Sequence, residues 1–291
     1  MLKQYLFLTK PGILFGNFIT TLGGFFLAAQ GRVDLPLLFL TLIGTTLVVA
    51  SGCVFNNIID QDIDQRMQRT RTRALVKKTI SVPVAFIFAT LLGILGFATL
   101  YFLVNSLACI FAAIGFIVYV GFYSLWTKRT SIHQTVIGSI SGACPPVIGY
   151  VAVANQVDYA AILLLVGYAF WQMPHSWGIA IYRLQDYTNA NIPILPVARS
   201  VKRTKIESTI YVVLFMACMN LLYYFDYADI WYAIILNATS LYWLYLSFIG
   251  FKAENDQIWA RNYFLFSVKL ITIISLGFYF TAKSPAPTLL F

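Results

Sequence analysis

Charged residues are scarce in this chain. They make up 11% of its 291 residues, whereas a soluble domain carries roughly 25%. Hydrophobic residues make up 59% of the chain, and its mean hydropathy is +0.76. This composition excludes a soluble globular protein and predicts an integral membrane protein that lies mostly within the bilayer. The net charge of +9 does not indicate a nucleic-acid partner, because the basic residues gather in alternate loops between apolar runs.

Cysteine and histidine are also rare. All four cysteines lie inside apolar runs, and no two are close enough to form a Cys-x-x-Cys pair: Cys53, Cys109, Cys144 and Cys218. The pattern indicates neither a disulfide framework nor a cysteine metal site, so we expect these thiols to pack as small hydrophobic groups. Only two histidines are present, His133 and His175.

Long apolar runs are abundant. We predict nine membrane-spanning segments, at about 12–30, 36–57, 82–104, 107–127, 134–153, 159–182, 208–225, 229–250 and 262–281. Most are near the roughly 20 residues that a spanning helix needs. Because the runs are continuous rather than alternating, they predict helices and not a β-barrel. No linker interrupts the pattern, so we expect one all-α domain over residues 1–291.

The basic residues also predict the orientation. Residues 58–81 and 183–207 form two long charged segments, whereas the other connections are mostly short. With the N-terminus in the cytoplasm, all but three of the 20 lysines and arginines lie on the inner side. The exceptions are Arg32, Lys283 and Lys269, of which Lys269 falls inside the last span. We therefore expect both long segments to face the cytoplasm.

The second span ends in a cluster of acids. Asn56, Asp60 and Asp64 are spaced i, i+4 and i+8, which on a helix places them on one face, with Asp62 pointing away. Acids at the membrane edge are costly unless something uses them. Mg²⁺ prefers one or two carboxylates together with substrate phosphates. The stripe therefore predicts a metal-bridged diphosphate site, the plainer alternative being acids that cap a helix end and pair with arginines.

Basic residues follow this cluster at once. They are Arg66, Arg69, Arg71, Arg73, Lys77 and Lys78. Arginine forks bind phosphate oxygens in pairs, so we expect Arg66, Arg69 and Arg73 to contact a diphosphate. Membrane orientation alone is the alternative explanation for each of them.

A second cluster lies at the end of the sixth span. His175, Tyr182 and Asp186 are spaced i, i+7 and i+11, again one helical stripe, and Pro174 is expected to loosen the helix beside it. Asp186 is a candidate metal or diphosphate ligand, and Tyr182 could contact the diphosphate or a carbocation. His175 is a candidate axial ligand if the second substrate carries iron; otherwise it is a hydrogen-bonded structural residue.

These clusters resemble the UbiA superfamily of intramembrane prenyltransferases, which carries one Asn/Asp-rich motif on its second helix and another after its sixth. The resemblance covers nearly the whole chain. It rests on residues 9–12 (TKPG), 56–64 (NNIIDQDID), 123–125 (YSL), 142–149 (GACPPVIG), 171–175 (WQMPH) and 186–193 (DYTNANIP). The WQMPH stretch is similar to the subgroup of this superfamily that uses haem as the prenyl acceptor.

The resemblance implies a helical bundle around a central cavity that opens to the cytoplasm, in a bacterial inner membrane. It implies that farnesyl diphosphate binds through Mg²⁺ at Asn56, Asp60 and Asp64, with Asp186 from the second motif. A vinyl group of haem B would take the farnesyl group, and water would complete the product. Terminal-oxidase assembly proteins are the partners that it suggests.

The second motif departs from the superfamily pattern. Tyr182 stands at the first acidic position of the Asp-x-x-x-Asp pattern, and Gln185 stands where the haem subgroup has a lysine. The resemblance thus assigns Asp60, Asp64, Tyr182 and Asp186 to catalysis. It assigns Gln185 to diphosphate binding, although Gln185 lacks the positive charge of the lysine.

Two other functions remain open. A UbiA-type enzyme that prenylates a quinone precursor or another aromatic acceptor would share the first motif, but the WQMPH stretch disfavours it. A transporter would also contain intramembrane acids, but it would place them near the membrane midplane. Here the acids lie at the predicted cytoplasmic mouth.

Overall fold

The computed structural model describes residues 2–283, which form helices and no β-strand. The long helices are α2 (Pro11–Ala29), α3 (Leu35–Ile59), α5 (Val82–Leu103), α8 (Gln134–Ala154), α9 (Tyr159–Tyr182), α12 (Val201–Tyr224), α13 (Ile230–Gly250) and α14 (Asp256–Thr281). A further long rod consists of α6 (Ser106–Ile117), the π-helix η1 (Val118–Thr127) and α7 (Lys128–Thr130). The short helices are α1 (Leu2–Leu8), α4 (Gln61–Arg66), α10 (Leu184–Asn189) and α11 (Leu195–Ala198).

Each predicted span coincides with one of the long helices. Within the described residues, eight helical rods are both long and apolar enough to cross a membrane. The remaining one, α9, has 24 residues but carries the polar side chains of Gln172, His175 and Ser176. Pro174 lies inside α9 without ending it. The count of nine crossings therefore stays a prediction, whereas the all-helical membrane architecture is confirmed.

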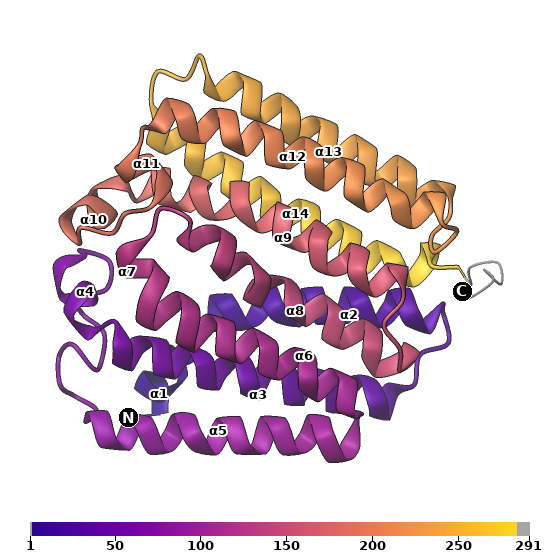
Figure 1. The fold of residues 1–291 in the computed structure, drawn as a ribbon, viewed down its shortest axis with the longest axis horizontal. Coiled ribbons are helices and arrows are strands. Elements are labelled where there is room, and N and C mark those ends of the chain that lie inside the picture. The colour runs from indigo at the N-terminus through magenta and orange to yellow at the C-terminus, as the bar shows by residue number, and fades with distance from the viewer. Residues whose placement is uncertain (1, 284–291) are drawn as a thin grey trace.

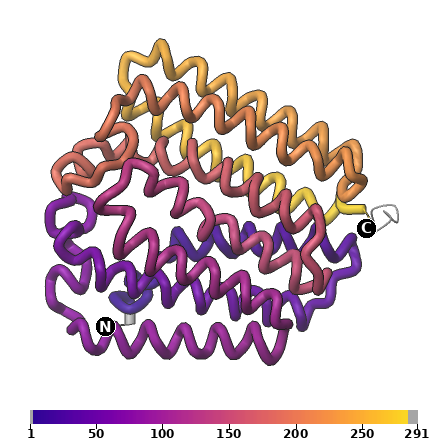
Figure 2. Tube along the Cα trace, viewed as in Figure 1, coloured from indigo at the N-terminus to yellow at the C-terminus, as the bar shows by residue number. Residues whose placement is uncertain are grey.

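The long helices run side by side, and the short ones gather at one end of the bundle (Figure 1). This end contains α4, α7, α10 and α11 together with the N-terminus, and α14 finishes at the opposite end. Figure 2 shows both long charged connections at the same end as the N-terminus. We call it the loop end, and it is the end that the distribution of charge predicts to be cytoplasmic.

Two of the long helices begin earlier than predicted. α12 begins at Val201 rather than near residue 208, and α14 begins at Asp256 rather than near residue 262. Hydropathy detects only apolar turns, whereas the first turns of these helices carry charged side chains such as Lys202, Arg203 and Asp256. Their first turns are capped by the side chains of Ser200 and Asn255, which accept hydrogen bonds from backbone N–H groups.

Close backbone contact joins α2 to α8. A Cβ atom on Gly24 would collide with the carbonyl of Pro146, and one on Gly149 would collide with the carbonyl of Thr21. Small residues allow membrane helices to approach this closely. The contact fixes two walls of the cavity described below.

Candidate active site

A cavity of about 1190 Å³ lies between α2, α3, the η1 rod, α8, α9 and α14. At the loop end its wall is polar and includes Lys10, Asn56, Asp60 and Asp64. Further along the same helices the wall becomes apolar, with side chains such as Ile19, Val48, Phe116, Ile148 and Ile271. The cavity therefore combines a charged mouth with an apolar interior, which suits a long apolar molecule with an anionic head group.

The first motif lies at this mouth. α3 ends at Ile59 and α4 begins at Gln61, so Asp60 stands at a break rather than inside one continuous helix. The backbone N–H of Asp60 still donates to the Asn56 carbonyl at 2.9 Å, and that of Asp64 to the Asp60 carbonyl at 2.8 Å. The predicted stripe therefore survives the break, and Asn56, Asp60 and Asp64 are all at least 96% buried.

Asp62 points away from this stripe, as predicted. Its side chain is 57% exposed and forms a two-pronged pair with Arg129, with N–O distances of 2.7 and 2.8 Å. The hydrogen bond from Arg129 lowers the pKa of Asp62. This pair links α4 to the end of the η1 rod at the mouth of the cavity.

Two lysines to which the sequence assigned no role in the site contact the motif. Lys10 Nζ donates to Asn56 Oδ1, and Lys128 Nζ donates to Asp60 Oδ2. Asn56 is oriented by a second bond, in which its Nδ2 donates to Ser124 Oγ of η1 at 2.8 Å. Burial lowers the pKa of Lys10 to about 8, so its charge is costly without an anion nearby. The only sequence signal for Lys10 was its place in the TKPG stretch.

The third member of the stripe pairs with an arginine that the sequence did predict. Arg73 donates to Asp64 Oδ2 at 2.6 Å and to Asn57 Oδ1 at 3.0 Å, and it lines the cavity together with Arg69. Arg66 is exposed and is not among the described residues that line the cavity. Each oxygen-bearing side chain of the stripe therefore already has at least one cationic partner.

The stripe has the donor chemistry for Mg²⁺. Asp60 Oδ1 is buried without a hydrogen-bond partner, and Arg129 Nη2 lies 3.8 Å from it. A buried carboxylate oxygen left unpaired is costly, so a cation there would stabilise it. No group of three or more His, Cys, Asp or Glu residues in the described chain could hold a metal by itself. Two carboxylates and an amide fit an ion that takes its other ligands from phosphates and water.

His175 faces the same cavity from α9. Its Nδ1 lies 2.7 Å from Ser267 Oγ, and its ring stacks on Trp171 at 4.6 Å between centroids. The single Ser267 hydroxyl proton is donated to the Phe264 carbonyl at 2.7 Å. With the Ser267 proton on that carbonyl, Ser267 Oγ accepts from His175 Nδ1–H, and the lone pair of the neutral ring then lies on Nε2.

The other residues of the second motif lie elsewhere. α9 ends at Tyr182 and α10 begins at Leu184, so the predicted stripe of His175, Tyr182 and Asp186 is interrupted. Among the described residues, the cavity lining includes His175 but neither Tyr182 nor Asp186. Tyr182 lies beneath the Arg183 guanidinium, 4.3 Å from its ring centroid.

Asp186 instead joins the two charged segments. It is 8% exposed, and its Oδ1 accepts a hydrogen bond from the backbone N–H of Gln68 at 2.8 Å. Its neighbour Gln185 is exposed and donates to Asn189. The roles predicted for Tyr182, Gln185 and Asp186 stay predictions. Tyr187, which sequence reasoning did not single out, does line the cavity.

Two tyrosines complete the polar end of the cavity. Tyr119 and Tyr123 stack with their centroids 5.9 Å apart, and both line the wall. They project from the π-helix, a form that is rare and often occurs at functional sites. Their aromatic faces lie in the same cavity as the acidic stripe.

The proteins that this chain resembles in sequence are prenyltransferases. The model of the UbiA prenyltransferase family matches residues 17–268. A protoheme IX farnesyltransferase of Acinetobacter baumannii is 71% identical over 289 residues, with 99% of each chain covered. One from Acinetobacter baylyi is 70% identical, also with 99% of each chain covered. Protoheme IX farnesyltransferase 2 of Pseudomonas fluorescens is 50% identical, covering 99% of this chain and 98% of its own.

Solved structures share the fold. A digeranylgeranylglyceryl phosphate synthase superposes with a TM-score of 0.77 at 21% identity, covering 96% of this chain and 97% of its own. A UbiA homologue of Archaeoglobus fulgidus, bound to GPP and Mg²⁺, has a TM-score of 0.73 at 15% identity, covering 95% and 99%.

Proposed function

This chain belongs to the UbiA prenyltransferase family, and we propose that it transfers the farnesyl group of farnesyl diphosphate to a vinyl group of haem B, giving haem O. The C–O bond of the diphosphate breaks, and its electron pair leaves with the diphosphate. A vinyl carbon forms the new bond to the farnesyl carbon. Water supplies a hydroxyl to the adjacent vinyl carbon and releases a proton.

One observation carries the site assignment: the three oxygen-bearing side chains at the cavity mouth each bind a basic side chain. Asn56, Asp60 and Asp64 would hold Mg²⁺. When bound, Mg²⁺ would stabilise the negative charge that develops on the leaving group. Lys10, Lys128 and Arg73 would then exchange their present partners for phosphate oxygens. Before the substrate binds, these basic side chains would neutralise the carboxylates of the stripe.

Asp186 would join the metal ligands by giving up its bond to the Gln68 backbone. That exchange would couple the two charged segments to diphosphate binding. Arg69 at the cavity wall would contact the diphosphate directly. Arg66 and Gln185, both exposed, would need the segments to close over the mouth before they could contact it.

The apolar interior would hold the farnesyl chain and keep water from the allylic cation. The ring faces of Tyr119 and Tyr123 would stabilise its positive charge by cation–π interaction. For the acceptor, the free Nε2 of His175 is suited to contact haem iron, because imidazole is a common axial ligand. The stacked Trp171 and the bond to Ser267 hold the imidazole ring in place.

The protein is an integral membrane protein, and we place it in a bacterial inner membrane with its N-terminus and cavity mouth in the cytoplasm. Haem O is a precursor that another enzyme or a terminal oxidase must receive, so assembly proteins of such oxidases are the partners we propose.

Mass analysis of the haems tests the proposal. Purified protein would be supplied with farnesyl diphosphate, Mg²⁺ and haem B, and the expected product is a haem in which a hydroxyethylfarnesyl group stands in place of one vinyl group. A parallel reaction would replace haem B with 4-hydroxybenzoate. Prenylation of the benzoate with no change in the haem would support the quinone-type alternative and contradict haem as the acceptor.

A further inference from the structure

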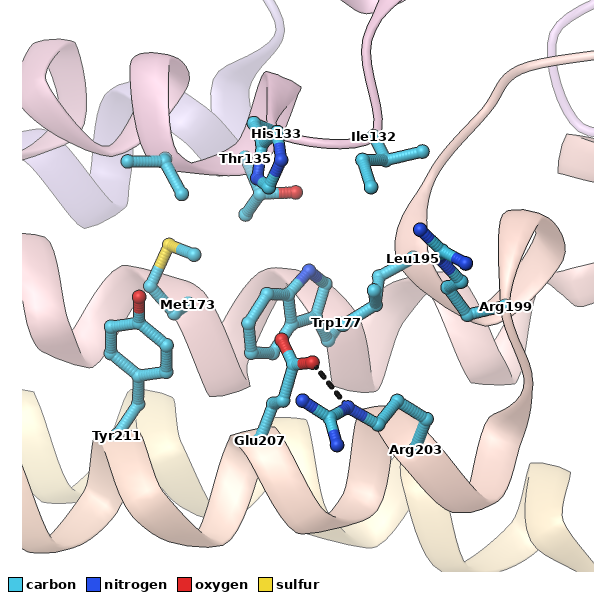
Figure 3. A pocket seen from close by; sticks show the side chains of 11 residues that line it. Ile132, His133, Thr135, Met173, Trp177, Leu195, Arg199, Arg203, Glu207 and Tyr211 are labelled. Carbon is cyan, nitrogen blue, oxygen red and sulfur yellow. Dashed lines mark hydrogen bonds and ion pairs between the residues drawn. The ribbon is translucent and has the colours of Figure 1, made fainter.

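A second cavity, of about 600 Å³, lies on another face of α9 (Figure 3). We call it the side groove. It is formed by the start of α8, by α9 and α11, and by the first turns of α12. Met173 and Trp177 of α9 line it, whereas His175 of the same helix lines the active-site cavity. Thr135 borders both, but the side groove contains none of the acidic stripe.

The side groove contains a buried hydrogen-bond donor without an acceptor. Trp177 is 3% exposed, and its Nε1 has no hydrogen-bond partner in the described chain. Figure 3 shows this nitrogen directed into the open space beneath His133 and Thr135. In contrast, the indole N–H of Trp171 donates to the Ser267 carbonyl at 3.0 Å. A buried N–H group normally has an acceptor. Trp243 Nε1 also has none in the described chain, but only Trp177 lines this groove, where there is room for a ligand oxygen.

The charges around the groove favour an anion. Arg199 and Arg203 both line it and both are exposed, and His133 lies across from them. Arg203 Nε donates to Glu207 at 2.7 Å, which leaves the rest of its guanidinium available. No ion pair forms with Arg199 within the described residues. Two arginines against one glutamate leave a positive site with forked donors, which suit phosphate oxygens.

Exposed apolar side chains also lie on the helices that form the groove. Apolar side chains beside it on α8 and α12 are exposed: Val136 by 42%, Ile140 by 40% and Ile210 by 52%. Met173 and Tyr211 form its inner wall. A ligand seated here would therefore have its head at the loop end and its body along apolar helices. A soluble anion would not use these apolar walls.

We propose that the side groove binds an anionic phospholipid. Its phosphate lies between Arg199 and Arg203, an ester or phosphate oxygen accepts the Trp177 N–H, and an acyl chain follows α8 and α12. Basic pockets between helices on the cytoplasmic side of a membrane bind such lipids. The bound lipid joins α9 to α11 and α12, and so braces the segment that carries the second motif. This site is separate from the prenyl-transfer reaction and does not depend on its acceptor.

Native mass spectrometry of the purified full chain tests the proposal. Protein reconstituted with equal amounts of phosphatidylglycerol and phosphatidylcholine should retain phosphatidylglycerol preferentially. The Arg199→Gln/Arg203→Gln double variant should lose at least nine-tenths of this retention, and Trp177→Phe should lose part of it. Lys202→Gln is the matched control, because Lys202 is exposed between the two arginines and does not line the groove. It should retain lipid as the wild type does.

Several results would overturn the proposal. Equal retention of the two lipids by the wild-type protein would do so without any variant, and thus without concern for folding. Undiminished phosphatidylglycerol in a folded double variant would do so as well. Displacement of the lipid by inorganic phosphate alone would show that the groove binds a free anion instead. Displacement by haem B alone would assign the groove to the acceptor.

Discussion

At the scale of single residues, the acidic stripe of Asn56, Asp60 and Asp64 forms hydrogen bonds and ion pairs that substrate binding would rearrange. Asn56, Asp60 and Asp64 are buried and each binds a basic side chain, yet Asp60 Oδ1 has no hydrogen-bond partner. A stripe that was only structural would be expected to have all its buried oxygens satisfied. The unpaired oxygen is therefore the feature that favours a metal over a simple network of ion pairs.

Substitution of the stripe should abolish turnover without preventing membrane insertion. We expect Asp60→Ala and Asp64→Ala to lower kcat at least about 100-fold, the scale of losing one group that stabilises charge in a transition state. The measurement is haem O formation at saturating Mg²⁺ by purified variants. Asp62→Ala is the control, because Asp62 is exposed and bound to Arg129. Near-normal Mg²⁺-dependent activity in Asp60→Ala or Asp64→Ala would refute the metal assignment.

The two lysines should act on the diphosphate rather than on the acceptor. Lys10→Met and Lys128→Met each remove a cation from the mouth, so we expect KM for farnesyl diphosphate to rise about tenfold, equivalent to ~1.4 kcal/mol. KM for haem should stay within about twofold, or ~0.4 kcal/mol. Lys3→Met is the control, since Lys3 is exposed on α1. A rise in KM for haem alone would place these lysines at the acceptor.

The two histidines should differ in haem binding. His175→Ala removes the only imidazole that lines the described cavity, so we expect the haem absorbance titration to weaken about tenfold, or ~1.4 kcal/mol, with diphosphate binding retained. His133→Ala is the matched control, because His133 lies in the side groove. Unchanged haem affinity in His175→Ala would exclude His175 as a ligand.

At the scale of elements, the nine apolar runs identified the long helices, because the lipid interior selects for continuous apolar sequence. The runs did not reveal where α12 and α14 begin, since those turns are polar and charged. Spacing along the chain was enough to predict that Asn56, Asp60 and Asp64 share one face, and these residues line the cavity together with His175. Their roles stay predictions. Lys10 and Lys128 could not be placed, because their partners lie on other helices.

The contact between α2 and α8 gives a prediction at this scale. Gly149→Ala should lower the free energy of unfolding by about 1–3 kcal/mol, the usual range for overpacking a tight interface, because the new methyl group would meet the Thr21 carbonyl. Thermal unfolding in detergent measures the change. Gly277→Ala on α14 is the control, since nothing lies within 4 Å of its added Cβ. Equal melting temperatures for the two variants would show that the helices can separate at no cost.

At the scale of the whole molecule, the uncertain crossing is α9. Its polar side chains lower its hydropathy, but Gln172, His175 and Ser176 all line the cavity rather than the lipid-facing surface. Polar groups within a membrane helix are tolerated when they face the interior of the bundle. The polar side chains of α9 are therefore compatible with a membrane crossing, although the hydropathy of α9 alone does not identify one.

Reporter fusions test this crossing and the orientation together. If α9 crosses and the positive-inside rule holds, residues 154–158 lie outside and residues 183–207 lie inside, and the C-terminus lies outside. Green fluorescent protein should fluoresce when fused after residue 200 and stay dark after residue 156, whereas alkaline phosphatase should show the reverse activities. A C-terminal fusion that fluoresces together with the fusion after residue 200 would mean an even number of crossings between these two points and would contradict the nine-span topology. Fluorescence after residue 156 but not after residue 200 would retain the crossing of α9 and reverse the orientation, which would move the acidic stripe away from the cytoplasm.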